Sequence, residues 1–481
     1  MINKKGLLIF ISFLISIPSI FYFRFLLNNK VLIKSFILKF FSDSQMQNLS
    51  KYILPYREIK ILEKDNRILK NLEKYGVDND KEIKESMVDL YFENNEIIKL
   101  KKTKLFLEKY NPQKNFIMRG IYDKVPGSAY IDNYQNQIIL LSSTGILGSS
   151  QYDKKLLKFK QIKNNIGEFI NEKQFKKSPK FSIKDLFISN EKIYLSFTNE
   201  VKENCWNTSI IFANFNFKEV KFEPFFMPDE CVNSLNNEDK VFEALQSGGR
   251  ISELDKNQII FTTGEFRSRS KAQDKDSVMG KILKINKDNK KFEVLAMGMR
   301  NAQGLYYDKT NKYILTTEHG PKGGDEINLI AKENSKKIFN LGWPISSYGE
   351  HYLKEKERLP GWSFEKNNPY LKYPLHKSHI KYGFLEPIKF YTPSIGISQI
   401  QAIDEKNKIY IHASLVDQSL YLFKLSDNNE IIKNLRININ ERIRDINKAD
   451  NKLFLFLETT SSIGIIDLDK SYKYLNRILE K

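Results

Sequence analysis

Histidine and cysteine are scarce in this sequence. It has five histidines in 481 residues, and all of them lie at position 319 or later. No imidazole is therefore available as a base or as a ligand in the first 318 residues. The two cysteines, Cys205 and Cys231, allow no more than one intrachain disulfide bond.

The chain also lacks a basic arm, although it is strongly basic as a whole. It has 77 lysines and arginines against 58 aspartates and glutamates, which gives a formal net charge of +19. The lysines are spread along the whole chain, mixed with asparagine, isoleucine and acidic residues. This distribution favours a solvated basic surface over a stripe that binds nucleic acid, so we predict no nucleic-acid partner. Such a surface still attracts anionic surfaces without specificity.

No cleavage site follows the apolar N-terminal segment. Residues 6–27 are almost continuously apolar, and Lys4 and Lys5 precede them. About 20 apolar residues span a bilayer, and lysines in this position favour a cytoplasmic N-terminus. Because a small-x-small motif is missing, an uncleaved anchor is favoured over a removed signal peptide. We predict that residues 1–29 form a single-pass transmembrane helix in the cytoplasmic (inner) membrane, with the remaining chain on the periplasmic, extracytoplasmic side.

The two cysteines are compatible with that location. An oxidising compartment permits a disulfide between Cys205 and Cys231. Closing a loop on the order of 25 residues contributes about 3 kcal/mol to the free energy of unfolding in the chain-entropy description. The alternative is a pair of unpaired thiols.

Residues 30–98 have a helical and polar pattern. Apolar positions such as Ile61, Leu62, Ile68 and Leu69 recur at helical spacing, and glycine and proline are few before Gly76. We predict a helical stalk, a cap on the main domain, or a helix on the membrane surface, and the pattern does not distinguish these.

From about residue 99 to residue 481 the pattern changes to short apolar runs. An asparagine or lysine turn is followed by three to five apolar residues, which usually end in serine, threonine or alanine. Buried strands have such continuous apolar runs, and imperfect copies at intervals are typical of a radial repeat. We predict an all-β fold, a six-bladed β-propeller, because radial closure leaves only short sheet edges; a pair of β-sandwiches is the alternative. The copies lie at 136–143, 192–196, 257–263, 312–317, 408–413 and 452–457.

Residues 340–406 interrupt this series. They contain many prolines and tyrosines, Trp343 and Trp362, and three of the histidines. We interpret the segment as a long loop over one face of the domain, because long loops within compact domains are usually functional or disordered.

Three motifs beside a predicted strand carry the chemistry. They are GMRNAQG at 298–304, EHGPKGGDEIN at 318–328 and GWP at 342–344. Glycines allow a tight turn, and exposed carbonyls beside adjacent carboxylates form the oxygen-rich site that a hard cation such as calcium prefers. The alternative for an isolated GGDE is an acidic surface turn.

In order and spacing, these motifs resemble those of the PQQ-dependent sugar dehydrogenases. This is the glucose/sorbosone dehydrogenase family, which includes soluble glucose dehydrogenase and the bacterial aldose sugar dehydrogenases. Weaker matches at 247–250, 279–285, 386–394 and 441–445 extend the resemblance over the C-terminal three-quarters of the chain. The resemblance implies a quinoprotein oxidoreductase that oxidises a sugar at its anomeric carbon, with PQQ and calcium as cofactors and an electron acceptor that the sequence does not identify.

By resemblance, the site residues fall into three groups. Arginines are expected because their forked donors pair with the carboxylates of a planar quinone. For Arg442 and Arg444 the alternative is an exposed basic edge. The residues implied are Arg300, Asn301, Gln303, Arg442 and Arg444 for the quinone; Gly320, Pro321, Asp325 and Glu326 for calcium; and Tyr391 and Trp343 for the sugar.

The chain departs from the family pattern at the general base. Gln246 stands where the family has a histidine, and a neutral amide cannot accept the proton. Val416 stands near the place of a cofactor-binding lysine, and Glu265 replaces an aspartate. The base could come from elsewhere, such as His319 or Glu265. Alternatively, the propeller has lost oxidation and binds calcium with a sugar or glycan, or it is an anchored scaffold for a protein partner.

Overall fold

The computed structural model describes residues 80–468, apart from 101, 102, 104, 114–119, 122–124, 332–336 and 353–371. The chain divides into two compact units, Met1–Arg67 and Ile68–Lys481, and all the described residues belong to the second. The predicted anchor and most of the predicted stalk lie outside the described residues. Within the described residues, no helix combines the length and the apolar character that a bilayer crossing requires.

The described part of the chain is almost entirely β-strand, as the sequence predicts. Apolar runs such as Gln258–Thr263 form strands whose side chains are buried on both faces, because sheets pack against each other on either side. The few short helices are α5 (Asp80–Ser86), η1 (Ile166–Glu168), α6 (Glu172–Lys177), α7 (Ser270–Gln273) and η2 (Ile380–Tyr382).

The largest sheet has nine strands and contains both the first and the last described strands. Its strand β2 pairs antiparallel with β29, so residues from opposite ends of the described chain are joined by backbone hydrogen bonds. The order is β27 (Ile443–Ala449), β28 (Lys452–Leu457), β29 (Ser462–Asp467), β2 (Phe106–Pro112), β1 (Leu90–Lys99), β6 (Leu156–Gln161), β5 (Leu147–Gln151), β4 (Gln137–Ser142), β3 (Ala129–Tyr134).

The remaining sheets follow one another along the chain. The second sheet is β12 (Glu223–Phe226), β10 (Cys205–Asn214), β9 (Lys192–Lys202), β8 (Ile183–Ser189), with β13 (Val232–Asn233) on β10. The third is β14 (Gly248–Asp255), β15 (Gln258–Thr263), β16 (Ile282–Asn286), β17 (Phe292–Met297), β21 (Phe339–Asn340). Next come β18 (Ala302–Asp308), β19 (Tyr313–Glu318), β20 (Asp325–Ala331), β22 (Lys389–Tyr391), then β23 (Ile397–Asp404), β24 (Ile409–Ser414), β25 (Ser419–Leu425), β26 (Ile431–Asn438). A small parallel pair joins β7 (Lys163–Asn164) to β11 (Glu219–Val220).

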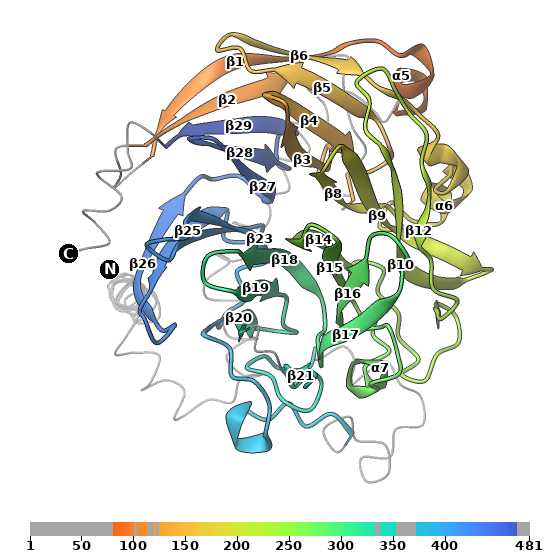
Figure 1. The fold of residues 1–481 in the computed structure, drawn as a ribbon, viewed down its shortest axis with the longest axis vertical. Coiled ribbons are helices and arrows are strands. Elements are labelled where there is room, and N and C mark those ends of the chain that lie inside the picture. The colour runs from red at the N-terminus through yellow and green to blue at the C-terminus, as the bar shows by residue number, and fades with distance from the viewer. Residues whose placement is uncertain are drawn as a thin grey trace, which may run out of the picture. The chain divides into compact units, whose positions relative to one another are not determined.

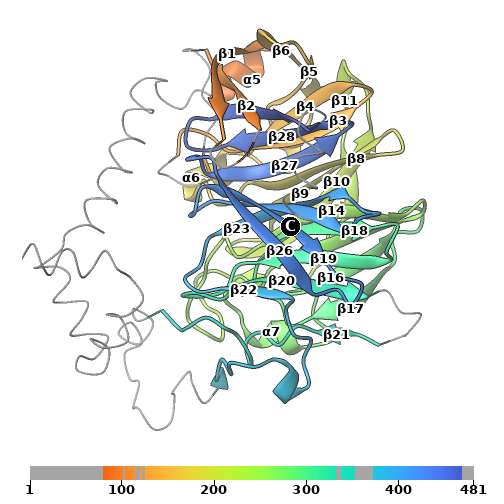
Figure 2. The same cartoon turned by 90° about the vertical axis from the view of Figure 1, so that its left-hand side faces the viewer.

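Six strands meet around a common centre (Figure 1). In the cyclic order β3, β8, β14, β18, β23, β27 each contacts the next, and β27 contacts β3 again. We refer to these six as the inner strands. The remaining strands of each sheet lie outside them, and Figure 2 shows the same sheets turned by 90°. The architecture is therefore all-β and propeller-like.

Side chains bridge every junction between neighbouring inner strands. Edge strands leave backbone groups without a ladder partner, and here polar side chains of the adjacent inner strand bind them. The pairs are Asp445 with Ile131 N, Asp132 with Ile188 N, Asp185 with Ile251 N, Arg250 with Gln303 O, Gln399 with Leu305 N, and Ser398 with Ile443 O.

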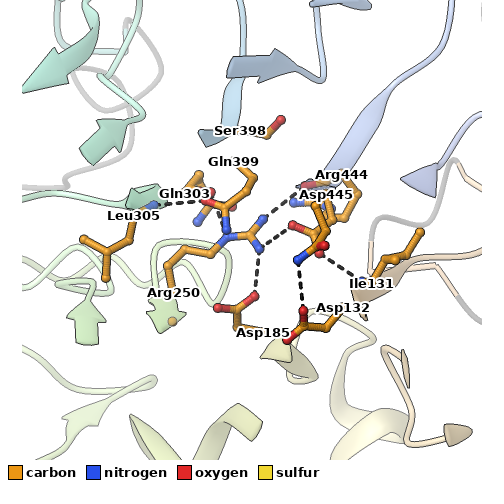
Figure 3. Close-up of polar contacts among 12 residues, drawn as sticks. Ile131, Asp132, Asp185, Arg250, Gln303, Leu305, Ser398, Gln399, Arg444 and Asp445 are labelled. Carbon is orange, nitrogen blue, oxygen red and sulfur yellow. Dashed lines mark hydrogen bonds and ion pairs between the residues drawn. The ribbon is translucent and has the colours of Figure 1, made fainter. Parts of the chain in front are cut away.

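Arg250 is the centre of this arrangement (Figure 3). Its Nη1 donates to Asp185 Oδ1 at 2.8 Å and to Asp445 Oδ1 at 2.7 Å, and its Nη2 donates to the carbonyl of Arg444 at 3.1 Å. The side chains of the arginine and the two aspartates are only 2–3% exposed. Burial alone lowers the pKa of Arg250, but attraction to Asp445 and Asp185 outweighs it and raises the pKa, so the guanidinium stays charged.

The hydrophobic core lies between neighbouring sheets. One cluster joins Ile139 and Leu141 of β4 to Ile193 and Leu195 of β9. A cluster farther along the chain joins Leu315 of β19 to aromatic residues of β24 and β25. Each sheet is therefore fixed by apolar packing on its faces and by the polar bridges at its inner edge.

Two predictions about the elements are wrong. Residues 90–98, predicted to be helical, form most of β1, in which Leu90 and Phe92 alternate with less buried residues at the period of a strand. The propeller-like domain therefore begins earlier than residue 99. Residues 340–406, interpreted as one long loop, contain β22 and the whole inner strand β23, whose polar Ser398, Gln399 and Gln401 interrupt its apolar pattern.

Cys205 and Cys231 form a disulfide, with their Cα atoms 5.4 Å apart. Cys205 begins β10 and Cys231 directly precedes β13, which pairs with it. The bond fixes the end of the second sheet.

Replacing Arg250 with methionine should lower the free energy of unfolding by about 3 kcal/mol or more, because it leaves two buried aspartates without their partner. Arg436→Met is the matched control, since that arginine pairs with Asp417 at the surface with its side chain 49% exposed. Breaking such a surface pair costs about 1 kcal/mol or less. Denaturant unfolding of both variants tests this, and equal losses would contradict a central role for Arg250.

Candidate functional site

The predicted site residues gather at one end of the inner strands. Arg444 lies near the start of β27, Gln246 lies before β14 and Arg300 before β18, and His319 follows β19, whose last residue pairs with the first residue of β18. Lys184, which the sequence did not predict, lies near the start of β8. Arg250 and its two aspartates lie farther along the same strands. We refer to the buried residues Arg300, Arg442, Arg444 and Lys184, together with Glu458, as the cation cluster.

Arg300 is held from several sides. Its Nη1 donates to the carbonyls of His319 and Gly320, both at 2.9 Å, and its backbone N–H donates to the carboxylate of Glu318. The indole ring of Trp343 lies 5.5 Å from the guanidinium carbon, close enough for a cation–π interaction. Because Arg300 is only 5% exposed, its position is fixed by the fold.

Gln246 lies between a carboxylate and two arginines. With its amide oriented to satisfy its neighbours, Nε2 donates to Glu265 Oε1 at 2.6 Å, and Oε1 accepts from Arg300 Nη2 at 2.7 Å and Arg267 Nε at 3.2 Å. Glu265 is fully buried, and burial raises its pKa to about 7 despite the nearby Arg269 and Arg300. Glu265 therefore lies behind Gln246, where it orients the side chain at the expected base position.

Arg442 and Arg444 share one buried counter-ion, Glu458. Nε of Arg444 donates to Glu458 Oε1 at 2.6 Å, and Nε of Arg442 donates to Oε2 at 3.3 Å. The arginines are 8% and 7% exposed, so the alternative of an exposed basic edge is wrong. Burial raises the pKa of Glu458, but both arginines outweigh it and hold the pKa below its usual value. One carboxylate thus pairs with two guanidinium groups.

Asn301 and Gln303 support the backbone near Arg300. Asn301 Oδ1 accepts from the N–H of Gly248 at 3.2 Å and from Gln303 Nε2 at 3.0 Å. The carbonyl of Gln303 in turn accepts from Nε of Arg250. These contacts tie the predicted quinone residues to the central arginine.

His319 lies beside Arg300, whose Nη1 donates to the His319 carbonyl at 2.9 Å. Burial lowers the pKa of its imidazole, Asp325 opposes this, and both Arg300 and Arg444 lower the pKa further. Both arginines therefore disfavour the protonated form of this imidazole. Nε2 of this ring is bonded to the carbonyl of Ile397.

Asp325, predicted to lie beside calcium, binds backbone N–H groups. Its Oδ2 accepts the N–H groups of residues 395–397 at 2.7–3.1 Å, and its Oδ1 accepts the N–H of Gly320 at 3.2 Å. A Cβ at Gly320 would lie 2.2 Å from the carbonyl oxygen of Gly324, so this turn requires glycine. Asp325 thus positions the carbonyls of the Gly320–Pro321 turn.

Glu326, also predicted to bind metal, faces a histidine. Its Oε1 lies 3.3 Å from His379 Nε2, and both side chains are buried. Glu326 lies opposite Glu318 in the β19–β20 register, and burial, with Glu326 as the second cause, raises the pKa of Glu318. Among the described residues, no group of three or more histidine, cysteine or acidic side chains is arranged to hold a metal ion.

The two predicted sugar residues have different surroundings. Trp343 stacks beneath Arg300 and is 5% exposed, whereas Tyr391 packs against the core cluster of β19, β23 and β24. The hydroxyl of Tyr391 is hydrogen-bonded to His412 Nε2 at 2.9 Å. Val416, at the place of the family lysine, is 57% exposed and adds no charge to the cluster.

Sequence reasoning missed Lys184 and Glu458. Both are buried in the cluster, but neither belongs to a motif, and a lysine is inconspicuous among 77 basic residues. The apolar run before Glu458 is a weak signal, because it marks a strand end where site residues collect.

A cavity of about 380 Å³ lies along the later residues of the inner strands. Each of the six strands contributes to its lining, for example Asp132, Ser189, Ser252, Tyr306, Gln401 and Asn447. Burial raises the pKa of Asp132 to about 7. The cavity and the cation cluster thus involve opposite ends of the same strands, with Arg250 between them.

Fold and site together define a class: a propeller-like protein whose inner strands place buried arginines next to a glycine-rich turn. A sequence model of the Glucose / Sorbosone dehydrogenase family matches residues 181–466. The chain is therefore a divergent member of the Glucose / Sorbosone dehydrogenase family.

Individual relatives support this assignment. Aldose sugar dehydrogenase YliI of Escherichia coli (strain K12) is 25% identical over 238 residues, which cover 45% of this chain and 58% of that protein. The chain spans about half the length of the curated relatives that it matches over more than 200 residues. The PQQ-bound form of aldose sugar dehydrogenase from Streptomyces coelicolor has the same fold, with a TM-score of 0.51 and 17% identity over 73% of this chain and 97% of that chain. The apo-form of the soluble aldose sugar dehydrogenase from Escherichia coli also has this fold, with a TM-score of 0.52. It is 18% identical in sequence, and the match covers 73% of this chain and 98% of that chain.

Asp325→Ala should lower the free energy of unfolding by about 2 kcal/mol or more, because four backbone donors lose a charged acceptor. Most of this loss should persist in a chelator, because the backbone donors lose their acceptor whether or not calcium is present. Asp427→Ala, at a fully exposed side chain, is the control and should change little. Thermal unfolding in both buffers tests this. A loss of stability in Asp325→Ala that is seen only with calcium would indicate that Asp325 is a metal ligand.

Proposed function

We propose that this protein is a quinoprotein sugar dehydrogenase that oxidises an aldose at its anomeric carbon. The proposal depends on one observation: Arg300, Arg442 and Arg444 are all buried beside the starts of the inner strands β18 and β27, in the part of the chain that belongs to the family. Arg442 and Arg444 share the carboxylate of Glu458, and burial raises the pKa of Glu265 and Glu318, the carboxyl groups near Arg300. Buried cations require counter-ions, and an anionic ligand supplies them.

PQQ fits this requirement. It is planar and carries several carboxylates, which guanidinium groups bind in pairs. In the proposal, Arg300, Arg442 and Arg444 hold these carboxylates, while Asn301 and Gln303 fix the loop that carries Arg300. When bound, the quinone supplies the group that accepts a hydride.

For calcium, the donors that fit are the carbonyls of Gly320 and Pro321. Carbonyl oxygens suit this hard cation, and the carboxylate of Asp325 holds their turn through the N–H of Gly320. Arg300 Nη1 already donates to the Gly320 carbonyl, so an ion there would share that oxygen or displace the arginine. The carboxylate of Glu326 faces His379 and takes no part.

The blade number and the location are part of the proposal. We infer six blades from the closed cycle of six inner strands, with β27–β29 and β3–β6 of the nine-stranded sheet belonging to two of them. The disulfide supports a location outside the cytoplasm, because such bonds persist in oxidising compartments. Anchoring through residues 1–29 stays a prediction. Tyr391 and Trp343 also stay predicted sugar contacts.

The test is cofactor binding by the full chain, followed by turnover. PQQ added with calcium should bind at one molecule per chain, as seen in its absorbance, and aldoses should then reduce an artificial electron acceptor. Arg444→Gln should weaken PQQ binding about tenfold to a hundredfold, because hydrogen bonds to charged groups contribute about 1.5–3 kcal/mol. Arg436→Gln, at the surface, is the control.

Absence of PQQ binding by the wild-type chain would contradict the proposal. Binding without oxidation of any aldose would favour the alternative, in which the domain binds calcium with a sugar, glycan or protein partner but has lost turnover.

A further inference from the structure

Lys184 is a buried lysine in the cation cluster to which no motif or relative assigns a role. It lies on β8 directly before Asp185, the partner of Arg250, and is 6% exposed. Its stem lies flat on the backbone of Gly249, where a Cβ would be only 2.4 Å from the Cβ of Lys184. Gly249 follows Gly248, whose N–H is bound by Asn301. Lys184 therefore packs against the segment that begins with Gln246, the expected position of the base.

Within the part of the chain that the structure describes, the amine of Lys184 has no carboxylate as a hydrogen-bond partner. Nζ donates to the carbonyl of Lys180 at 2.6 Å and, at 3.4 Å, to Ser182 Oγ. A neutral amine that uses both hydrogens in this way keeps its lone pair for a third partner. The charged groups around it come from three segments: Arg444 on β27, and Glu243 and Lys180, which form an ion pair with each other at 3.1 Å.

We propose that Lys184 is the proton acceptor that replaces the histidine missing at Gln246. This inference rests on the proposed function. The sugar hydroxyl loses its proton to Nζ, which becomes an ammonium group; the adjoining C–H hydrogen leaves with its electron pair for the bound quinone, and the C–O bond becomes a carbonyl. The sugar thus loses one proton to Nζ and one hydride, with both of its electrons, to the quinone.

The other candidates are less suitable. The amide of Gln246 is not a base, and Glu265 is fully buried behind it. The imidazole of His319 has a lowered pKa and is bonded through Nε2 to Ile397. In contrast, burial, with Arg444 as the second cause, lowers the pKa of Lys184 to about 7, which suits a base at neutral pH.

The proposal predicts how turnover depends on pH. Because only the neutral amine accepts a proton, wild-type turnover should rise as the pH increases through about 7. Lys184→Met should lower single-turnover rates about 10²–10⁴-fold, as expected for loss of a general base, and should remove this limb of the pH profile. PQQ should still bind at one molecule per chain.

Lys281 supplies the matched control. It is also a buried lysine with a lowered pKa, of about 8, but its Nζ donates to three backbone carbonyls of residues 271, 272 and 279. Lys281→Met should destabilise the protein and leave the pH profile of turnover unchanged.

A second measurement does not depend on activity. In full-length protein labelled at lysine 13Cε, one resonance should titrate near pH 7 and be missing from Lys184→Met, and another should titrate near pH 8 and be missing from Lys281→Met. If the Lys184 resonance titrates like that of a surface lysine, or if Lys184→Met binds PQQ and retains the wild-type rate and pH profile, Lys184 is not the base. Failure of the wild-type chain to bind PQQ overturns the proposed function and this assignment together.

Discussion

The buried Arg250 determines how this domain closes. It joins β14 to β8 through Asp185, to β27 through Asp445 and the carbonyl of Arg444, and to β18 through the carbonyl of Gln303. Further polar side chains bridge the remaining junctions, so every junction of the ring has at least one hydrogen bond from a side chain to the backbone of the neighbouring inner strand. A closed ring can neither slide nor open at one junction without leaving a buried polar group unpaired, which is costly.

The site depends on this closure. Residues that are far apart in the sequence are useful only because the inner strands start at the same end of the ring. Arg250 connects directly to both sides of the cation cluster: it binds the backbone of Arg444, and it binds Gln303, which supports Asn301 beside Arg300. The hydrogen bonds of Arg250 therefore fix the backbone that carries the positively charged side chains of the cluster. Asp325 likewise fixes the Gly320 turn by binding backbone N–H groups.

The sequence allows much of the fold to be predicted, and less of the site. Apolar runs such as those of β4, β15 and β28 indicate buried strands without reference to tertiary structure. The inner strand β23 could not be predicted in this way, because Ser398 and Gln399 interrupt its apolar run. These polar side chains form hydrogen bonds with the neighbouring inner strands. The motifs identify Arg300, Arg442 and Arg444, but their burial and their shared use of Glu458 follow only from packing. The sequence does not distinguish Lys184 from other lysines, since burial and Arg444 on another strand are the main causes of its low pKa.

A crystal structure of the full chain with PQQ and calcium would show where the quinone binds. We expect the quinone at the starts of the inner strands, with its carboxylates on Arg300 and on Arg442 or Arg444, and with Nζ of Lys184 facing the same space. A quinone bound instead in the cavity lined by Ser252 and Gln401, on the other side of Arg250, would contradict this expectation.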